Sequence, residues 1–155
     1  MNIHKNKNEK GIALVEVIAA LGIAVIVITS LVSLSISTMR ASLKSKLLLE
    51  GSKIANREIE LVRAFRDNSA TWSDFLTVLA CTSLNPCSMK TDGSGIISGR
   101  TIENPGTTEA LTRSFTATDP SSNGIIRISV SVTWNVGNDA HGAYLQTDLT
   151  NWRGR

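Results

Sequence analysis

The amino-acid sequence predicts an α+β protein in which one long N-terminal helix packs on a small C-terminal antiparallel sheet. Residues 12–39 are almost entirely apolar, and residues 47–65 carry apolar side chains three and four positions apart. Residues 126–134 alternate between apolar and polar side chains. The first pattern is typical of a helix in lipid or in a dry protein interior, the second of an amphipathic helix, and the third of a half-buried strand.

Residues 1–11 form a short polar leader that ends at Gly11. They contain Lys5, Lys7 and Lys10 against Glu9, so most of the formal charge of +3 belongs to this leader. Such a leader resembles a targeting segment and is set aside from the fold. Because little positive charge remains in the rest of the chain, no nucleic-acid partner is expected.

The apolar segment 12–39 predicts a transmembrane helix. No charged residue occurs from Val17 to Met39, and about 20 such residues are enough to cross a bilayer. An ordinary secretory signal is an alternative, with cleavage after the apolar run at the small residues Ser33-Leu34-Ser35. Lysine and arginine flank both ends of the segment, so the positive-inside rule does not give its orientation.

Glu16 interrupts the apolar segment near its start. An ionised carboxylate within a membrane costs a few kcal/mol, so it needs a partner. Cleavage after Gly11 would create one, the new amino terminus of Ile12, either in the same chain or in a neighbouring molecule. The alternative is that Glu16 lies at the level of the lipid headgroups, one turn from the end of the helix.

The chain resembles the type IV pilin superfamily, and the likeness rests on Lys10-Gly11-Ile12-Ala13-Leu14-Val15-Glu16 followed by an apolar helix. The resemblance implies that a membrane aspartyl peptidase, the prepilin peptidase, cuts after Gly11 and then methylates the new amine of Ile12. It also implies that Glu16, the fifth mature residue, pairs with a neighbouring subunit's amino terminus during assembly. Ile12 replaces the phenylalanine that is common at the first mature position.

Within this superfamily the chain resembles minor pilins of the PilV type, since residues 56–68 are similar to the end of the long helix in many minor pilins. The resemblance therefore implies a structural subunit rather than an enzyme, held in the cytoplasmic membrane by one helix, with an exported head, and later part of a pilus at the cell surface. Its partners would be the prepilin peptidase, the membrane, and other pilin subunits through the N-terminal helix. Two alternatives stay open: a pseudopilin of type II secretion, and a signal-anchored exported binding domain that does not polymerise.

The helical pattern continues beyond Met39 into an amphipathic half over residues 40–68. No proline occurs before Pro86, so nothing forces a break between the two halves. A helix from Ile12 to about Arg66 is on the order of 80 Å long, more than a domain of this size can bury. The first half is therefore expected to project while the second packs on a head, the pilin-like lollipop. The apolar stripe that would face the head is Leu47, Leu48, Gly51, Ile54, Ala55, Ile59, Leu61, Val62 and Phe65.

The head is expected over residues 69–155. Residues 72–79 predict one short helix capped by Ser73, and residues 96–97 and 101–102 predict a short edge strand. Strands are expected over 111–118, 126–134 and 143–149, with the turn-rich segment 119–124 joining the first two.

Cys81 and Cys87 are the only cysteines. If the head is exported they are expected to form a disulfide, which would stabilise it by about 2 kcal/mol on the chain-entropy model. The alternative is two unpaired thiols in a flexible loop. Zinc is not expected, because two cysteines are too few ligands and the only histidines, His4 and His141, are distant in sequence.

The sequence shows no pattern typical of an active site. It has no nucleophile elbow, P-loop, dinucleotide fingerprint or HExxH motif. His141 lies alone in a turn-like Ala-His-Gly context. We therefore expect no catalytic residues, no metal and no cofactor.

Overall fold

The computed structural model describes residues 9–106, 109–121 and 124–152, and within these ranges the side chains of 13–106, 109–118 and 124–152. The first eight residues of the predicted leader lie outside the described residues. The described elements are α1 (Glu9–Asn68), α2 (Trp72–Val78), β1 (Cys87–Met89), β2 (Ile96–Ser98), β3 (Thr101–Glu103), β4 (Leu111–Ser121), β5 (Ile125–Val136) and β6 (Asp139–Thr150). Every strand pair is antiparallel, so the predicted α+β class is confirmed.

Helix α1 runs without interruption for 60 residues. It ends at Asn68, where the N–H of Ser69 donates to the carbonyls of Phe65 and Arg66 at 3.1 and 3.2 Å. The chain divides into two compact units, residues 1–43 and 44–155. The division falls four residues beyond the boundary between 39 and 40 that the hydropathy pattern predicts.

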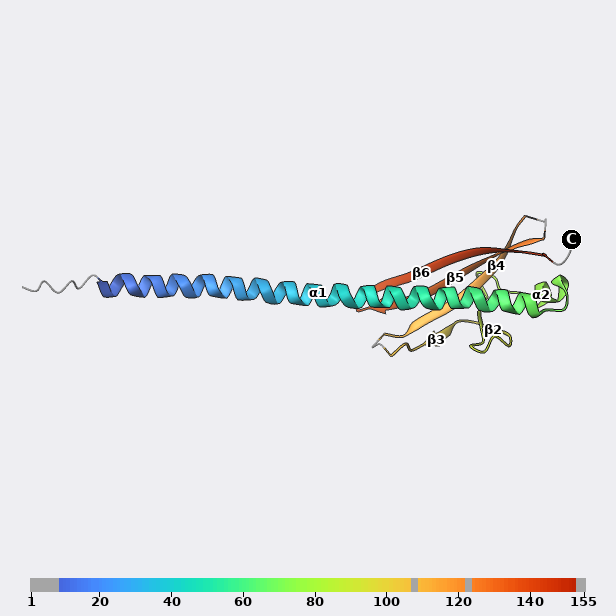
Figure 1. Cartoon of the computed structure of the whole chain (residues 1–155), viewed down its shortest axis with the longest axis horizontal. Coiled ribbons are helices and arrows are strands. Elements are labelled where there is room, and N and C mark those ends of the chain that lie inside the picture. Colours follow the sequence, from blue (N-terminus) through green and yellow to red (C-terminus); the bar gives the residue numbers. More distant parts are fainter. Residues whose placement is uncertain (1–8, 107–108, 122–123, 153–155) are drawn as a thin grey trace, which may run out of the picture. The chain divides into compact units, whose positions relative to one another are not determined.

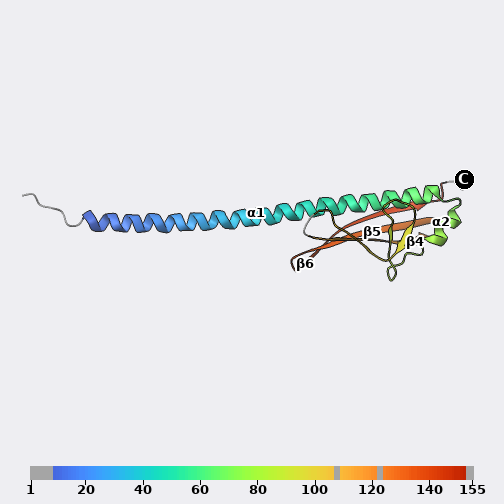
Figure 2. The same cartoon turned by 90° about the horizontal axis from the view of Figure 1, so that it is seen from below.

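The second unit contains the C-terminal part of α1 and one sheet with the strand order β2-β1-β4-β5-β6. Strand β3 also pairs with β4. It pairs with residues 111–113 at the start of β4, next to Phe115, where β1 pairs. Strands β4, β5 and β6 run alongside this part of α1 (Figure 1). The turned view shows the helix on one side of these strands (Figure 2).

The core lies between the helix and the inner face of the sheet. Strand β5 buries alternate residues, as its period-two pattern predicts. The helix contributes a stripe that repeats every three or four residues. The buried apolar residues of these elements are Leu47, Ile54, Ala55, Ile59 and Val62 from α1, and Ile126, Ile128, Val130, Val132 and Trp134 from β5.

The predicted stripe is wrong at one position, because Leu48 is exposed. Leu48 follows the buried Leu47 directly and is turned by about 100° around the helix axis, away from the sheet. Leu61 and Phe65 are partly exposed near the end of the helix.

Gly51 is the point of closest approach between α1 and the sheet. A Cβ atom built at Gly51 would lie 2.6 Å from the ring of Trp134. The bare glycine surface therefore lets the indole lie directly on the helix backbone, and Trp134 is only 4% exposed.

The short helix α2 is capped differently from the prediction. Thr71, not Ser73, is the N-cap residue: its side chain accepts from the N–H of Asp74, while the Asp74 carboxylate accepts from the N–H of Thr71. This reciprocal pair satisfies two helix-end donors, which Ser73 inside the first turn cannot do.

The predicted strands are present, and three of them are longer than expected. Strand β4 continues to Ser121, into the segment predicted as a turn, and β6 begins at Asp139. The single short edge strand expected over 96–102 is two strands, β2 and β3, because Gly99 has a φ of 99° and interrupts it. Strand β1 was not predicted from the sequence.

Candidate functional site

The first turns of α1 carry the residues of the prepilin-like motif. Gly11 and Ile12 have helical backbone, and the side chain of Ile12 lies outside the described residues. Glu16 is exposed one turn after Ile12, about 6 Å further along the axis. Among the described residues Glu16 makes no hydrogen bond or ion pair, so within this part of the chain its carboxylate is open to a partner.

The surface of α1 is apolar on all sides through most of the first unit. Every described side chain from Ala13 to Ser42 is exposed, and aliphatic residues around the whole circumference are half or more exposed, among them Leu14, Ile18, Leu21, Val25 and Leu31. Among the described residues this is the one helix long and apolar enough to span a membrane. A helix with no polar face is stable only in lipid or against other apolar helices.

Three hydroxyl groups of this surface are satisfied within the helix. Thr29 donates to the Val25 carbonyl at 2.9 Å, Ser30 to the Ile26 carbonyl at 2.7 Å, and Thr38 to the Leu34 carbonyl at 2.9 Å. These bonds remove the need for water, so the three residues are compatible with a hydrocarbon environment.

Cys81 and Cys87 are joined by a disulfide that closes a short loop before β1. The two half-cystines are 1% and 6% exposed. The carbonyl of Cys81 accepts from the N–H of Ala117 at 2.6 Å, and Cys87 pairs with Phe115, so both ends of the loop are attached to β4.

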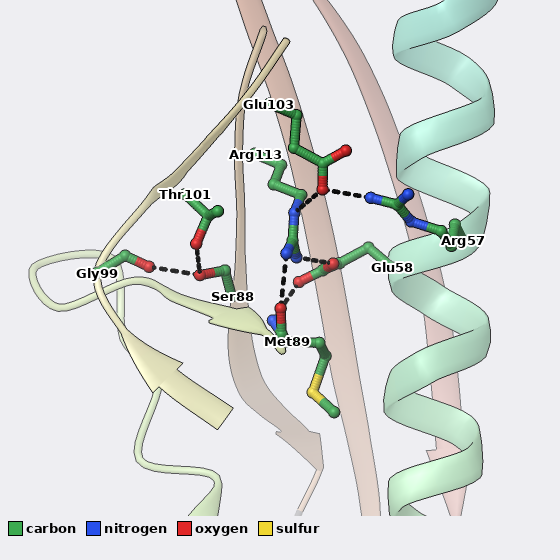
Figure 3. Close-up of polar contacts among 8 residues, drawn as sticks. All are labelled: Arg57, Glu58, Ser88, Met89, Gly99, Thr101, Glu103 and Arg113. Atoms are coloured by element: carbon green, nitrogen blue, oxygen red, sulfur yellow. Dashed lines mark hydrogen bonds and ion pairs between the residues drawn. The ribbon is translucent and has the colours of Figure 1, made fainter. Parts of the chain in front are cut away.

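A buried ion pair lies directly beyond this loop, between α1 and β4. Glu58 is fully buried and Arg113 is 1% exposed. The Arg113 guanidinium donates to the Glu58 carboxylate, and Figure 3 shows the two side chains meeting beside Met89 of β1. Two opposite charges removed from water in this way must satisfy each other's remaining hydrogen bonds.

The backbone of Met89 completes the hydrogen bonding of this ion pair. Its N–H donates to Glu58 Oε1 at 2.6 Å, and its carbonyl accepts from Arg113 Nη2 at 2.7 Å. One residue of β1 therefore supplies both a donor to the buried anion and an acceptor for the buried cation.

A second carboxylate extends the cluster toward the surface. Arg113 Nε lies 2.6 Å from Glu103 Oε1 of β3, and the same oxygen accepts from Arg57 of α1 (Figure 3). The four charges balance, two arginines against two glutamates. Glu58 and Arg113 are buried, Glu103 is partly buried and Arg57 is exposed. We call these four residues, after the pair at their centre, the buried charge cluster.

Burial raises the pKa of the Glu58 carboxyl above its usual range, because desolvation disfavours the charged form. The Met89 N–H and the Arg113 guanidinium oppose this rise. Ionisation of Glu58 thus depends on its two partners being in place.

Two of the hollows among the described residues can be given with their walls, and neither resembles an active site. A groove of about 290 Å³ is lined by charged residues, and its walls include the ion pairs Lys53–Glu50 and Arg57–Glu103. A hollow of about 50 Å³ lies at the end of α1, between Trp72 and Trp152. No group of three or more His, Cys, Asp or Glu side chains that could hold a metal occurs in residues 13–106, 109–118 and 124–152.

Comparison with known proteins gives no relative. The chain matches no protein-family model, no curated protein and no solved structure.

The buried charge cluster is the feature that sequence reasoning missed. Glu58 lies four residues after Ile54 and four before Val62, within the apolar stripe, and a carboxylate at that position signals a buried partner. Arg113 is buried, and Arg127 donates to Asp148 at 2.8 and 2.9 Å.

Proposed function

We propose that the chain is a structural minor pilin of the PilV type, processed by a prepilin peptidase and assembled through its N-terminal helix. The observation that carries this proposal is the exposed, predominantly apolar surface of α1 from Ala13 to Met39, in which Glu16 is the single charged residue. Such a surface suits both stages of a pilin's existence, first in lipid and then among the helices of neighbouring subunits.

The leader would be removed at the bond between Gly11 and Ile12. The backbone is helical there, whereas a peptidase needs an extended substrate, so the first turn of α1 must open locally. Glycine lowers the cost of that opening, since it favours the helix less than alanine does by about 1 kcal/mol. Cleavage frees the amine of Ile12, four residues before Glu16.

Glu16 would then set the register of assembly. A carboxylate near the end of a membrane helix is unfavourable by up to about 3 kcal/mol. The amine of a neighbouring subunit removes that cost when the two helices are correctly staggered. A misplaced subunit leaves both charges in an apolar environment, so the pair favours one stagger over others.

The head would lie on the exported side of the membrane and become part of the pilus surface. Its disulfide is compatible with an oxidising compartment, and the six-stranded sheet gives a rigid body to be carried by α1.

The test is a comparison of Glu16→Ala with Glu60→Ala in cells that assemble pili. Glu60 is an exposed carboxylate of the same helix, paired only with the neighbouring Arg63, and serves as the matched control. We expect both variants to be cleaved after Gly11, and only Glu16→Ala to be reduced at least tenfold in purified filaments. Normal incorporation of Glu16→Ala would contradict the assigned role.

The same experiment separates the two alternatives. A type II secretion pseudopilin predicts copurification with secretion components instead of pili. A signal-anchored binding domain predicts no filament incorporation of the unaltered chain.

A further inference from the structure

We infer that the Cys81–Cys87 disulfide acts as a redox-controlled latch, which docks β1 onto the buried pair Glu58–Arg113 and so completes the head only after oxidation. The inference rests on the proposed function in one respect, that the head moves from a reducing to an oxidising compartment. The docking itself follows from the contacts of the second unit.

The latch depends on a short covalent connection. Cys87 is the first residue of β1 and Met89 is its last, so the residue that satisfies both buried charges lies two positions from the disulfide. The disulfide ties Cys87 to Cys81, and the Cys81 carbonyl is held by the N–H of Ala117 on β4. Oxidation thus fixes β1 next to β4, the strand that carries Arg113.

Backbone pairing contributes little to holding β1 against β4. The strand has three residues, and its pairing with β4 is a single residue pair, Cys87 with Phe115. Its other neighbour, β2, is also three residues long. The Ser88 hydroxyl adds bonds to the Gly99 carbonyl and to Thr101 of β3, a strand that is itself paired with β4 (Figure 3). Without the disulfide, β1 and β2 can leave the charge pair once these two side-chain bonds and the pairing of Cys87 with Phe115 break.

Undocking would expose the buried Met89 side chain, and it carries a further cost because charges are buried beneath β1. Removing the Met89 donor and acceptor takes one hydrogen bond from Glu58 and one from Arg113. Water must then enter to replace these bonds, or the two buried charges lack a hydrogen-bond partner. An apolar pair of similar size would not impose this requirement. Because of the charges, β1 is either docked with both hydrogen bonds made or undocked with both lost. The disulfide determines which of these two states is populated.

The redox step is ordinary thiol–disulfide exchange. A disulfide-bearing oxidant protein of the exported compartment accepts two electrons and becomes a dithiol. Cys81 and Cys87 lose two protons and form the S–S bond through a mixed disulfide. Both sulfurs are buried in the product, which protects it from thiols in solution.

The test is a double-mutant cycle on the full chain in detergent micelles. It compares the unaltered protein, Cys81→Ala/Cys87→Ala, Glu58→Leu/Arg113→Met, and all four substitutions together. Loss of a loop closure this short should lower the folding equilibrium constant about fifty-fold in any background. In the protein that keeps Glu58 and Arg113, we expect removal of the disulfide to lower the folding equilibrium constant by a further tenfold or more. In the Leu/Met background, we expect removal of the disulfide to cause the loop-closure effect alone. Equal losses in the two backgrounds, within about twofold, would overturn the inference.

A second measurement keeps the inference testable if the Leu/Met variant does not fold. Amide hydrogen exchange is compared between the oxidised protein and Cys81→Ala/Cys87→Ala. We expect the Met89 amide to exchange at least a hundredfold faster in the variant, and amides of the central strand β5, such as Val130, to change less than tenfold. An unchanged Met89 amide would overturn the latch. Neither measurement involves the N-terminal motif, so failure here leaves the pilin proposal to its own test.

Discussion

At the scale of single residues, Glu58 shows how one buried charge organises its surroundings. It lies on the sheet-facing side of α1, where its neighbours Ala55, Ile59 and Val62 are buried and apolar. A lone carboxylate there would be strongly unfavourable. The structure offsets this cost with groups from two further elements, the Arg113 guanidinium from β4 and the Met89 N–H from β1.

Neutralising Glu58 should therefore destabilise the head far more than neutralising a neighbouring glutamate. We expect Glu58→Gln to lower the free energy of unfolding by about 3 kcal/mol, because Arg113 is left as a buried, unpaired cation. Glu60→Gln, on the exposed side of the same turn, should change it by less than about 0.5 kcal/mol. Urea unfolding followed by tryptophan fluorescence measures both. Equal effects of the two substitutions would show that the buried pair contributes no more than a surface pair.

At the scale of elements, the packing of α1 on the sheet depends on one close approach. The ring of Trp134 from β5 fills the space that a side chain at Gly51 would need. Glycine within a helix normally lowers the stability of the helix. The glycine at position 51 therefore indicates that the contact with the indole stabilises the head by more than the low helix propensity of glycine destabilises it.

Gly51→Ala tests this contact. The added methyl group would lie 2.6 Å from the indole ring, so α1 or Trp134 must shift. We expect a net destabilisation of about 1–2 kcal/mol, the overpacking cost reduced by the gain in helix propensity. Gly22→Ala is the control, since nothing lies within 4 Å of a Cβ built there and only the propensity gain remains. If Gly51→Ala stabilised the head, the close packing of Trp134 would be disproved. Thermal unfolding of both variants in the same detergent provides the comparison.

Elements with a strong local pattern could be predicted from the sequence. The uninterrupted apolar and amphipathic periodicity gave α1 to within a few residues, and the alternation from Ile126 to Trp134 gave β5. Strand β1 has no such pattern, because its three residues are all buried and its position depends on the disulfide and on Glu58 and Arg113. Those partners are distant in sequence, and no local rule brings them together.

The candidate sites also differ in how far they could be predicted from the sequence. Gly11, Ile12 and Glu16 form a local motif, and they were singled out from the local sequence and its resemblance to the type IV pilin superfamily. The pairing of Glu58 with Arg113 spans 55 residues and became visible only in the fold. The position of Glu58 within an apolar stripe carried a signal that a buried cation was needed, but not which one.

At the scale of the whole molecule, the chain combines two units with different solvent requirements. Residues 13–42 expose apolar side chains on every side of α1, whereas residues 44–152 enclose a core between α1 and the sheet. The first unit is suited to lipid or to helix–helix contact and the second to water. The function that we propose uses both properties, with the first unit in a membrane or a filament interior and the second as the exposed head.

The most direct test of this account is the intact mass and N-terminal sequence of the protein extracted from membranes of cells that contain a prepilin peptidase. The account predicts a chain that begins at N-methylated Ile12, with the bond after Gly11 cut. A chain that still begins at Met1, or one cut beyond Ser35, would contradict it, and Glu16 would then be only a carboxylate at the membrane interface.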